Sequence, residues 1–305
     1  MNFSDDFIEF ENTISLTPTD VKFLRKARTA VKNKISKYFT ETLGIPAPKF
    51  IVQGSFTMGT IIKPIKGSFD IDLGVYINLE SSKVSDWPRP ETVSKWLKDS
   101  LFHHTNTSPI NKKTCVRVKY KPTTKSNDIQ YHVDLPIYAV SKNLLGWESI
   151  RIGQNGEKGW KEKSDPKGFS EWFNEVSQEN ENDKDQFKRV VKYLKAWKDQ
   201  NKKRRKFPNG MLLTVLAGKS YNLNTRDDLA FYKTVRKIYN KLTWSNKVRK
   251  PVEPFNDLGN YLTSSQWEKF HEVLGYLVDD LKLVLRLEDY SYGIDILRNQ
   301  FGKRF

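Results

Sequence analysis

Two aspartates, Asp70 and Asp72, lie two residues apart in the segment 69–77, whose sequence FDIDLGVYI alternates as a β-strand does. Residues two apart on a strand point to the same face, so the two carboxylates are expected to project together while their neighbours face the core. Carboxylates this close repel each other unless one is protonated or a cation lies between them. Oxygen ligands suit Mg²⁺ or Mn²⁺, so the pair is a candidate metal site.

A third aspartate, Asp134, lies in the segment 132–136, HVDLP, which shows the same alternation. Val133 and Leu135 are expected to face the core, and Asp134 the opposite side. Three carboxylates from neighbouring strands would hold two divalent ions about 4 Å apart, the arrangement that promotes in-line phosphoryl displacement. The four histidines show no metal-ligand spacing, and His132 is interpreted as a structural strand residue rather than a general base.

The pair Gly54 and Ser55 directly follows a short apolar strand predicted at 50–52. Glycine allows close approach, so this pair can present backbone N–H groups and a hydroxyl to phosphate oxygens. Taken alone, Gly-Ser is typical of an ordinary turn, and Asp-x-Asp is common on solvated strand faces. The succession of Gly-Ser, a strand with Asp-x-Asp and a later strand with a third Asp is much more specific.

The elements that must position these residues follow from residue periodicity. An amphipathic helix is predicted over 18–43 after the capping residue Thr17, and further strands over 116–120 and 129–139. The polar, glycine-bearing stretch from about 141 to 168 is interpreted as a crossing between lobes. Beyond it the periodicity is mostly helical, as at 187–197 and 274–285. The sequence therefore predicts an α+β fold with a division into 1–165 and a mainly helical 166–305.

Composition indicates a globular protein that handles polyanions. Hydrophobic residues make up 37% of the chain, and the net charge of +16 favours nucleotides or nucleic acid as partners. The segment 187–206 carries ten Lys or Arg against one Asp, and 231–250 carries seven with no acid. Lysine-rich surfaces also serve solubility alone, so charge by itself does not separate an enzyme from a nucleic-acid binder. A single cysteine, with no signal peptide or membrane-length apolar segment, predicts a cytoplasmic protein without membrane association.

The motifs together closely resemble those of the CD-NTases, the cGAS/DncV-like nucleotidyltransferases. The resemblance rests on Gln53-Gly54-Ser55-Phe56, Gly59-Thr60, Lys63-Pro64-Ile65, Phe69-Asp70-Ile71-Asp72-Leu73 and His132-Val133-Asp134-Leu135-Pro136. It implies a polymerase-β-like nucleotidyltransferase core and a C-terminal helical lobe, with the active site in the cleft between them. It also implies that Asp70, Asp72 and Asp134 are catalytic: Asp70 and Asp72 bind two Mg²⁺ or Mn²⁺ ions, and Asp134 completes the metal site nearest the attacking ribose hydroxyl and helps to activate it.

The resemblance further implies a set of nucleotide-binding residues. Gly54 and Ser55 would hold the donor triphosphate, with Gln53 beside them, and Lys192 would contact the triphosphate from a helix. Relatives often have a serine near position 209, where Asn209 is the closest match here. The run Gly218-Lys219-Ser220 lacks the earlier glycine of a phosphate-binding loop and is not interpreted as one.

Three functions remain open from the sequence. The first, which the resemblance implies, is synthesis of a cyclic di- or trinucleotide messenger from NTPs, ATP among them, in bacterial anti-phage (CBASS) defence with accessory proteins. The second is a linear oligonucleotide synthase or a transferase that nucleotidylates RNA or protein. The third is a non-catalytic RNA-binding protein on this fold. The two basic segments also leave RNA as a candidate activator.

Overall fold

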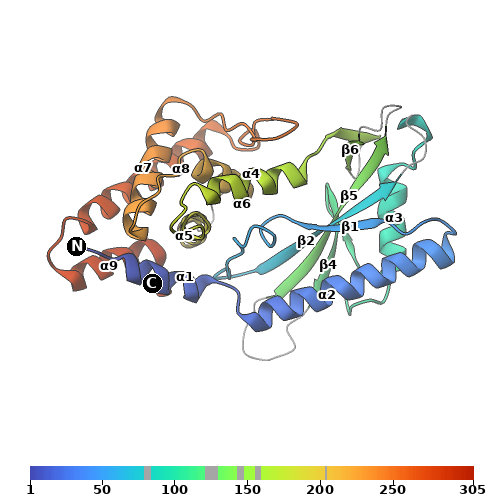
Figure 1. Cartoon of the computed structure of the whole chain (residues 1–305), viewed down its shortest axis with the longest axis horizontal. Coiled ribbons are helices and arrows are strands. Elements are labelled where there is room, and N and C mark those ends of the chain that lie inside the picture. Colours follow the sequence, from blue (N-terminus) through green and yellow to red (C-terminus); the bar gives the residue numbers. More distant parts are fainter. Residues whose placement is uncertain (79–83, 121–129, 143–147, 155–158, 203–204) are drawn as a thin grey trace. The chain divides into compact units, whose positions relative to one another are not determined.

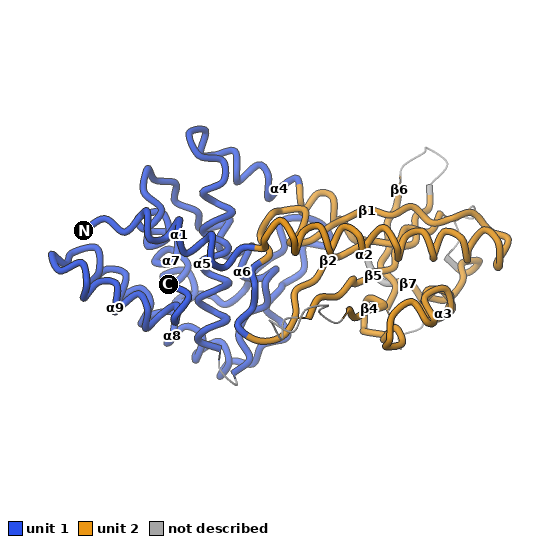
Figure 2. Tube along the Cα trace, turned by 90° about the horizontal axis from the view of Figure 1, so that it is seen from below, with its two compact units in different colours: residues 1–15, 62–65, 171–305 blue, residues 16–61, 66–170 orange. Residues whose placement is uncertain are grey.

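One mixed sheet carries all three aspartates. The computed structural model describes residues 1–78, 84–120, 130–142, 148–154, 159–202 and 205–305, and divides into two compact units (Figure 2). Residues 16–61 and 66–170 form the first, here called the sheet unit. Residues 1–15, 62–65 and 171–305 form the second, the helical unit.

The sheet is built around one parallel pair. Its strand order is β1-β2-β5-β4-β3, and β6 and β7 extend it from β5 (Figure 1). β2 and β5 run parallel, whereas every other pair among the described strands is antiparallel. The strands are β1 Lys49–Gln53, β2 Ser68–Asn78, β3 Ile110–Asn111, β4 Cys115–Tyr120, β5 Gln130–Lys142, β6 Glu148–Gly153 and β7 Trp160–Lys163.

Helices cover one face of this sheet and leave the aspartates on the other. The helices α2 Pro18–Lys37 and α3 Pro90–Ser100 contribute Leu24, Val31 and Leu97 to the core. The inward side chains of β2 and β5 meet them: Ile71, Leu73, Val75, Ile77, Val133, Leu135, Ile137 and Ala139. Because side chains alternate along a strand, the even-numbered residues, including the aspartates, lie on the opposite face.

The long N-terminal helix begins as its sequence predicts. The hydroxyl of Thr17 accepts a hydrogen bond from the backbone N–H of Asp20 at 3.2 Å, and the Asp20 carboxylate accepts from the Thr17 N–H at 2.8 Å. This reciprocal pair is a capping box, and it satisfies two backbone donors at the helix start. α2 continues into a short π-helix, Tyr38–Thr42, before Gly44. The predicted helix at 18–43 and the predicted strands at 50–52, 69–77, 116–120 and 129–139 are thus confirmed.

The interpretation of 141–168 as a crossing between lobes is wrong in its central part. β6 and β7 lie in this stretch and extend the sheet. Ile150 and Ile152 of β6 pack against Tyr76, Tyr138 and Val140 and form a small second core on the same face as the aspartates. Only two apolar residues mark this strand, which is why the polar composition around it concealed the alternation. Neither β3, β6, β7 nor α3 was anticipated from the sequence.

The helical unit contains most of the remaining helices. They are α1 Ser4–Ile14, α5 Gln186–Asn201, α6 Gly210–Gly218, α7 Asp227–Trp244, α8 Ser264–Val284 and α9 Tyr290–Phe301, while α4 Pro166–Gln178 enters this unit at residue 171. The helices predicted at 187–197 and 274–285 correspond to α5 and α8. Aromatic rings from the first and last helices meet at the centre, where Phe7 contacts Tyr193, Phe231 and Phe301. Residues 1–15 therefore pack with the C-terminal helices, which a division at residue 165 does not anticipate.

None of the described helices combines the length and the apolar content that a membrane-spanning segment requires.

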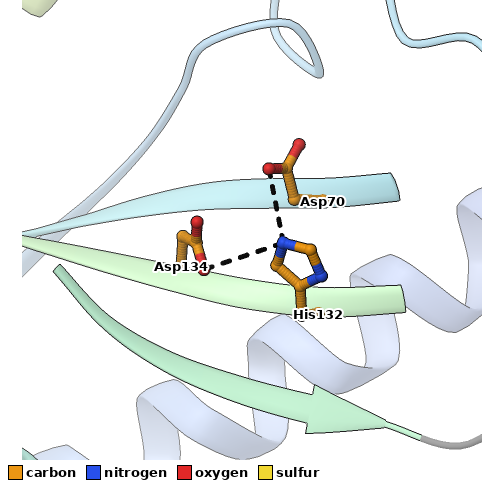
Figure 3. A group of neighbouring side chains, drawn as sticks. All are labelled: Asp70, His132 and Asp134. Atoms are coloured by element: carbon orange, nitrogen blue, oxygen red, sulfur yellow. Dashed lines mark ion pairs between the residues drawn. The ribbon is translucent and has the colours of Figure 1, made fainter. Parts of the chain in front are cut away.

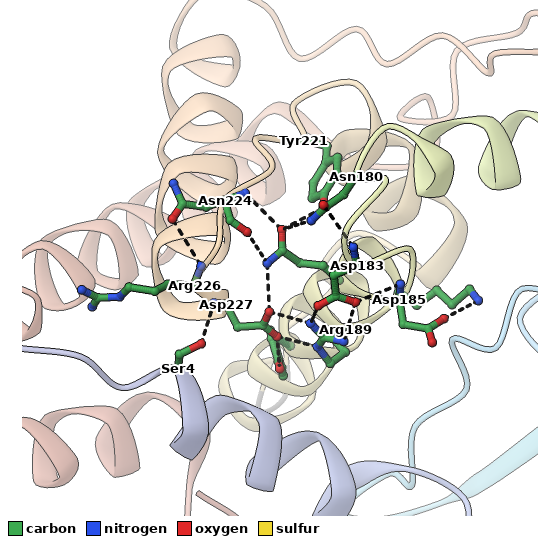
Figure 4. Close-up of polar contacts among 12 residues, drawn as sticks. Ser4, Asn180, Asp183, Asp185, Arg189, Tyr221, Asn224, Arg226 and Asp227 are labelled. Atoms are coloured by element: carbon green, nitrogen blue, oxygen red, sulfur yellow. Dashed lines mark hydrogen bonds and ion pairs between the residues drawn. The ribbon is translucent and has the colours of Figure 1, made fainter.

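A buried polar network holds α5 against α7 (Figure 4). The carboxylate of Asp227, whose side chain is 2% exposed, accepts from Arg189 Nε at 2.6 Å and from Arg189 Nη2 at 2.7 Å. It also accepts from the Tyr193 hydroxyl at 2.7 Å and from Gln186 Nε2 at 3.0 Å. Burial and the Asp227 charge raise the pKa of Tyr193, so this hydroxyl stays a donor. A buried carboxylate with this many donors is stable only while all of them are present.

We expect Asp227→Asn to lower the free energy of unfolding by about 3 kcal/mol, because it leaves a buried guanidinium with only part of its charge compensated. Urea denaturation measures this change. Asp295→Asn is the matched control, since the Asp295 side chain is 71% exposed and its ion pair with Arg298 spans 4.0 Å. The control should change stability by less than about 0.5 kcal/mol. Equal effects of the two changes would contradict the role given to the network.

Candidate active site

The parallel register of β2 and β5 brings the acidic residues together. Asp72 lies directly opposite Asp134, and Asp70 directly opposite His132. All four side chains share the face of the sheet that is not covered by α2 and α3. The sequence prediction that Asp70, Asp72 and Asp134 come from neighbouring strands and point to one face therefore matches the geometry.

His132 lies between two of the carboxylates (Figure 3). Its Nε2 atom is 3.4 Å from Asp70 Oδ2 and 3.9 Å from Asp134 Oδ1. This nitrogen is buried and has no hydrogen-bond partner among the described residues. Asp70, His132 and Asp134 each offer one ligand atom, and these atoms all lie within 4.8 Å of one another. The interpretation of His132 as a purely structural strand residue is incomplete, because its two-residue spacing to Asp134 on one strand places both side chains on the same face.

Arg117 of β4 is the cation of this site. Its Nε donates to Asp134 Oδ1 at 2.7 Å and its Nη2 donates to Asp134 Oδ2 at 2.6 Å. Such a two-pronged pair is the strongest way for an arginine to hold a carboxylate. Sequence reasoning did not single out Arg117, although its alternation with Val116 and Val118, both buried in the core, places it on the aspartate face.

The three carboxylates are only partly compensated by Arg117. Burial, followed by the charges of Asp70 and Asp134, raises the pKa of Asp72 to about 8, and Arg117 opposes this shift. The raised pKa means that burial and the two neighbouring carboxylates disfavour the ionised form of Asp72. A divalent cation would favour that ionised form, and carboxylate oxygens are suitable ligands for Mg²⁺ or Mn²⁺. The residues present therefore fit a divalent metal.

Gly54 allows the chain to pass close to one of these carboxylates. It adopts a φ of +72°, and a Cβ atom at this position would lie 2.2 Å from Asp72 Oδ2. No other residue type can occupy the position without displacing Asp72. Ser55 follows in the same turn, which is closed by a hydrogen bond from Thr60 N to Ser55 O at 2.9 Å. The structure thus gives Gly54 a role beside Asp72, and the predicted contact of Gly54 and Ser55 with phosphate stays a prediction.

Gln53 is held in place by two tyrosines. Its Nε2 donates to the Tyr138 hydroxyl at 2.7 Å, and its Oε1 accepts from the Tyr76 hydroxyl at 3.2 Å. The two tyrosine rings stack with centroids 4.6 Å apart. Gln53 therefore lies on the aspartate face, opposite Asp72 in the register of β1 and β2. Its predicted contact with nucleotide is untested.

Lys192 and Asn209, the two predicted nucleotide ligands of the helical unit, have protein partners. Lys192 of α5 pairs with Glu11, and its Nζ donates to Ser15 Oγ at 2.9 Å. Asn209 caps α6, where its Oδ1 accepts from Leu212 N at 2.9 Å. Their binding of nucleotide stays a prediction.

Comparison with known proteins agrees with this geometry. Residues 48–138 match the family model of the nucleotidyltransferase domain of DncV-like cyclic GMP-AMP synthases. The chain is 27% identical over 272 residues to a cyclic GMP-AMP synthase of Escherichia albertii, a match that covers 84% of this chain. It spans 57% of the length of that relative.

Solved structures share the fold. The apo form of Vibrio cholerae DncV superposes with a TM-score of 0.75 at 18% identity, over 99% of this chain and 96% of DncV. Escherichia coli DncV in its 3′-deoxy GTP bound form gives 0.72 at 17% identity, over 96% and 93%. CdnC of E. coli MS115-1, solved as a complex with HORMA-deltaN, gives 0.72 at 15% identity, over 99% and 98%.

The matched residues contain β1, β2, α3, β4 and most of β5, and therefore every acidic residue of the site. This part of the chain is a nucleotidyltransferase domain of the DncV-like kind, and the predicted α+β nucleotidyltransferase fold is confirmed. The matched domain and the shared fold agree with the resemblance to the CD-NTases that the motifs predicted.

We expect Arg117→Lys to lower the free energy of unfolding by about 1–3 kcal/mol, because an ammonium cannot reproduce the two parallel hydrogen bonds to buried Asp134. The measurement is urea denaturation in metal-free buffer. Arg89→Lys makes the same replacement at an exposed arginine of this unit and should change stability by less than about 0.5 kcal/mol. If both replacements cost the same, the Arg117–Asp134 pair is not what holds the acidic strand face together.

Proposed function

We propose that the chain is a metal-dependent nucleotidyltransferase that makes a cyclic di- or trinucleotide from NTPs, ATP among them. The observation that carries the proposal is that Asp70, Asp72 and Asp134 share one face of a DncV-like domain. Beside them lies a turn in which the backbone conformation of Gly54 and its closeness to Asp72 require a glycine. The similarity to cyclic GMP-AMP synthases supports the cyclic product.

The proposed reaction is attack of a ribose hydroxyl oxygen on the α-phosphorus of an NTP. One P–O bond forms, the bond between the α-phosphorus and the bridging oxygen breaks, and pyrophosphate leaves with the electron pair, while the hydroxyl proton passes to solvent or base. Two ions held by Asp70, Asp72 and Asp134 would supply charge neutralisation for the phosphates and the attacking oxygen.

The residues of the chain have separate parts in this proposal. Asp70 and Asp72 would hold the cations, and His132 Nε2, 3.4 Å from Asp70 Oδ2, would add a nitrogen ligand or fix that carboxylate. Both oxygens of Asp134 accept from Arg117, which orients this carboxylate beside the other two.

We also propose that the product is a messenger of bacterial anti-phage (CBASS) defence, and that accessory proteins assemble with the chain. The likeness to CdnC, whose structure contains a HORMA protein, supports such a partner. The NTP substrates place the proposed reaction in the cytoplasm.

Binding of divalent ions is expected to stabilise the folded protein. At a Mg²⁺ or Mn²⁺ concentration of about 100 times the dissociation constant, the free energy of unfolding should rise by about 2.7 kcal/mol. Thermal denaturation with increasing Mn²⁺ or with EDTA measures this. Asp70→Asn/Asp72→Asn should show no such rise, yet should be at least as stable as wild type in EDTA, because it removes two repelling charges. Asp295→Asn should respond to Mn²⁺ as wild type does. A metal response that survives in the double variant would place the ions elsewhere.

Gly54→Ala should reduce product formation by at least about 100-fold, because a Cβ atom moves Asp72 and a shift of about 1 Å at reacting groups costs this much. Gly44→Ala is the matched control: Gly44 has a φ of +66° and nothing within 4 Å of its Cβ position, so it tests backbone strain alone. The assay incubates each protein with all four NTPs and Mg²⁺ or Mn²⁺, treats with phosphatase and identifies products by mass spectrometry.

The products distinguish the remaining functions. A phosphatase-resistant product without free ends, lost in Asp70→Asn/Asp72→Asn, would establish a cyclic nucleotide synthase. Linear products would establish an oligonucleotide synthase. If no product forms and nothing is transferred to added RNA or protein, the synthase proposal is wrong.

A further inference from the structure

One tryptophan of the helical unit is almost fully solvent-exposed. Trp244, the last residue of α7, is 89% exposed, whereas the other tryptophans with described side chains are buried or half-buried. A single exposed apolar residue is common on protein surfaces, so the significance of this ring depends on the side chains around it. The opposite face of α7 is packed into the unit through Phe231, Val235 and Ile238, so the exposed face is not available to the core.

Several cations lie on the same side of α7 as this ring or near its C-terminal turn. On a helix of 3.6 residues per turn, Lys233, Lys237 and Trp244 fall on one stripe, and Lys241 lies beside it. Two more cations come from outside the helix: Lys219 Nζ donates to the backbone oxygen of Arg249 at 2.5 Å. Desolvation and the positive charges of Lys241 and Arg249 lower the pKa of Lys219, as expected where cations gather. These six residues, Lys219, Lys233, Lys237, Lys241, Trp244 and Arg249, are named the Trp244 surface.

No acid neutralises the Trp244 surface in the described part of the chain. The segment 231–250 contains no Asp or Glu, and none of the surface's five cations forms an ion pair with a described carboxylate. The nearby Asp257 accepts from Val248 N at 3.0 Å and from Gly259 N at 2.9 Å through Oδ1, and no ion pair joins it to the cations of this surface among the described residues. An uncompensated cluster of this kind is complementary to a polyanion.

We propose that the Trp244 surface binds single-stranded nucleic acid, with a base stacked on the Trp244 indole and backbone phosphates on the lysines of α7. A base stacks on an exposed aromatic ring only when it is unpaired, and stacking of this kind tolerates any sequence. Lys233 and Lys237 are about 6 Å apart along the helix axis, so they can contact successive parts of one backbone. The proposal concerns a surface outside the acidic site and stands independently of the synthase activity.

The composition of the surface argues against a lipid membrane. A helix that lies on a membrane presents a continuous apolar face with several large side chains. The apolar face of α7 is buried, and between the lysines and the tryptophan its exposed face carries Asn240 and Thr243. A single ring among cations matches the pattern of nucleic-acid stacking platforms.

The test is fluorescence anisotropy of a labelled 20-nucleotide oligouridylate RNA and its oligothymidylate DNA counterpart, without NTP or divalent ions. Trp244→Ala should weaken binding about 10-fold, and Trp244→Phe should retain most of it, because the ring is what the base contacts. Lys233→Ala/Lys237→Ala should weaken binding and reduce the slope of log affinity against log salt by about 1.4. Trp244 is exposed, so these changes do not threaten folding.

Two controls make the result decisive. Lys282→Ala/Arg286→Ala removes two exposed charges elsewhere in the helical unit and should leave binding within about twofold of wild type. Binding that Trp244→Ala weakens supports the proposal, whether the protein prefers the RNA or the DNA oligonucleotide. The proposal would be overturned if neither oligonucleotide bound, or if the Lys282→Ala/Arg286→Ala control lost as much affinity as the Trp244 surface variants. It would also be overturned if a duplex bound equally tightly and Trp244→Ala did not affect that binding. Trp244-dependent binding of anionic vesicles in place of nucleic acid would overturn it as well.

Discussion

The site depends on the parallel pairing of β2 with β5, which places Asp72 opposite Asp134 despite their like charge. The pairing is fixed from the other face of the sheet, where the alternate residues of both strands are buried. A slip of one residue would turn the whole apolar set to solvent, at a cost far above the repulsion between two carboxylates. Hydrophobic burial therefore holds the acidic residues in an arrangement that they would not adopt by themselves. The raised pKa of Asp72 reports the electrostatic cost of that arrangement.

Two further residues limit this cost without removing it. Arg117 neutralises Asp134 through two hydrogen bonds, and Gly54 lets the backbone pass beside Asp72 without a side chain between them. A divalent cation would favour the ionised form of Asp72, whose pKa is raised by burial and by its two acidic neighbours. This property links the fold to the proposed chemistry.

The sequence was informative where local alternation decides the outcome. Alternation predicted the strands and the common face of the three aspartates, and the capping residues predicted the start of α2. The sequence was less informative about contacts that depend on the pairing of strands distant in the chain. Arg117 and His132 could have been assigned to the aspartate face, but only the register of β4 with β5 places Arg117 against Asp134. β6 was concealed because a strand marked by two isoleucines does not stand out within a polar stretch.

The two basic segments look equivalent in the sequence, and the structure separates them. In 187–206, Lys188 pairs with Asp185, Lys192 with Glu11 and Lys202 with Asp199, so much of this charge is compensated within the protein. In 231–250 the lysines of α7 have no such partners among the described residues. Net charge alone cannot make this distinction, because the neutralising acids come from other parts of the chain. Since counterion release requires cations that are free to meet phosphate, the affinity for nucleic acid is expected to reside in the second segment rather than in the first.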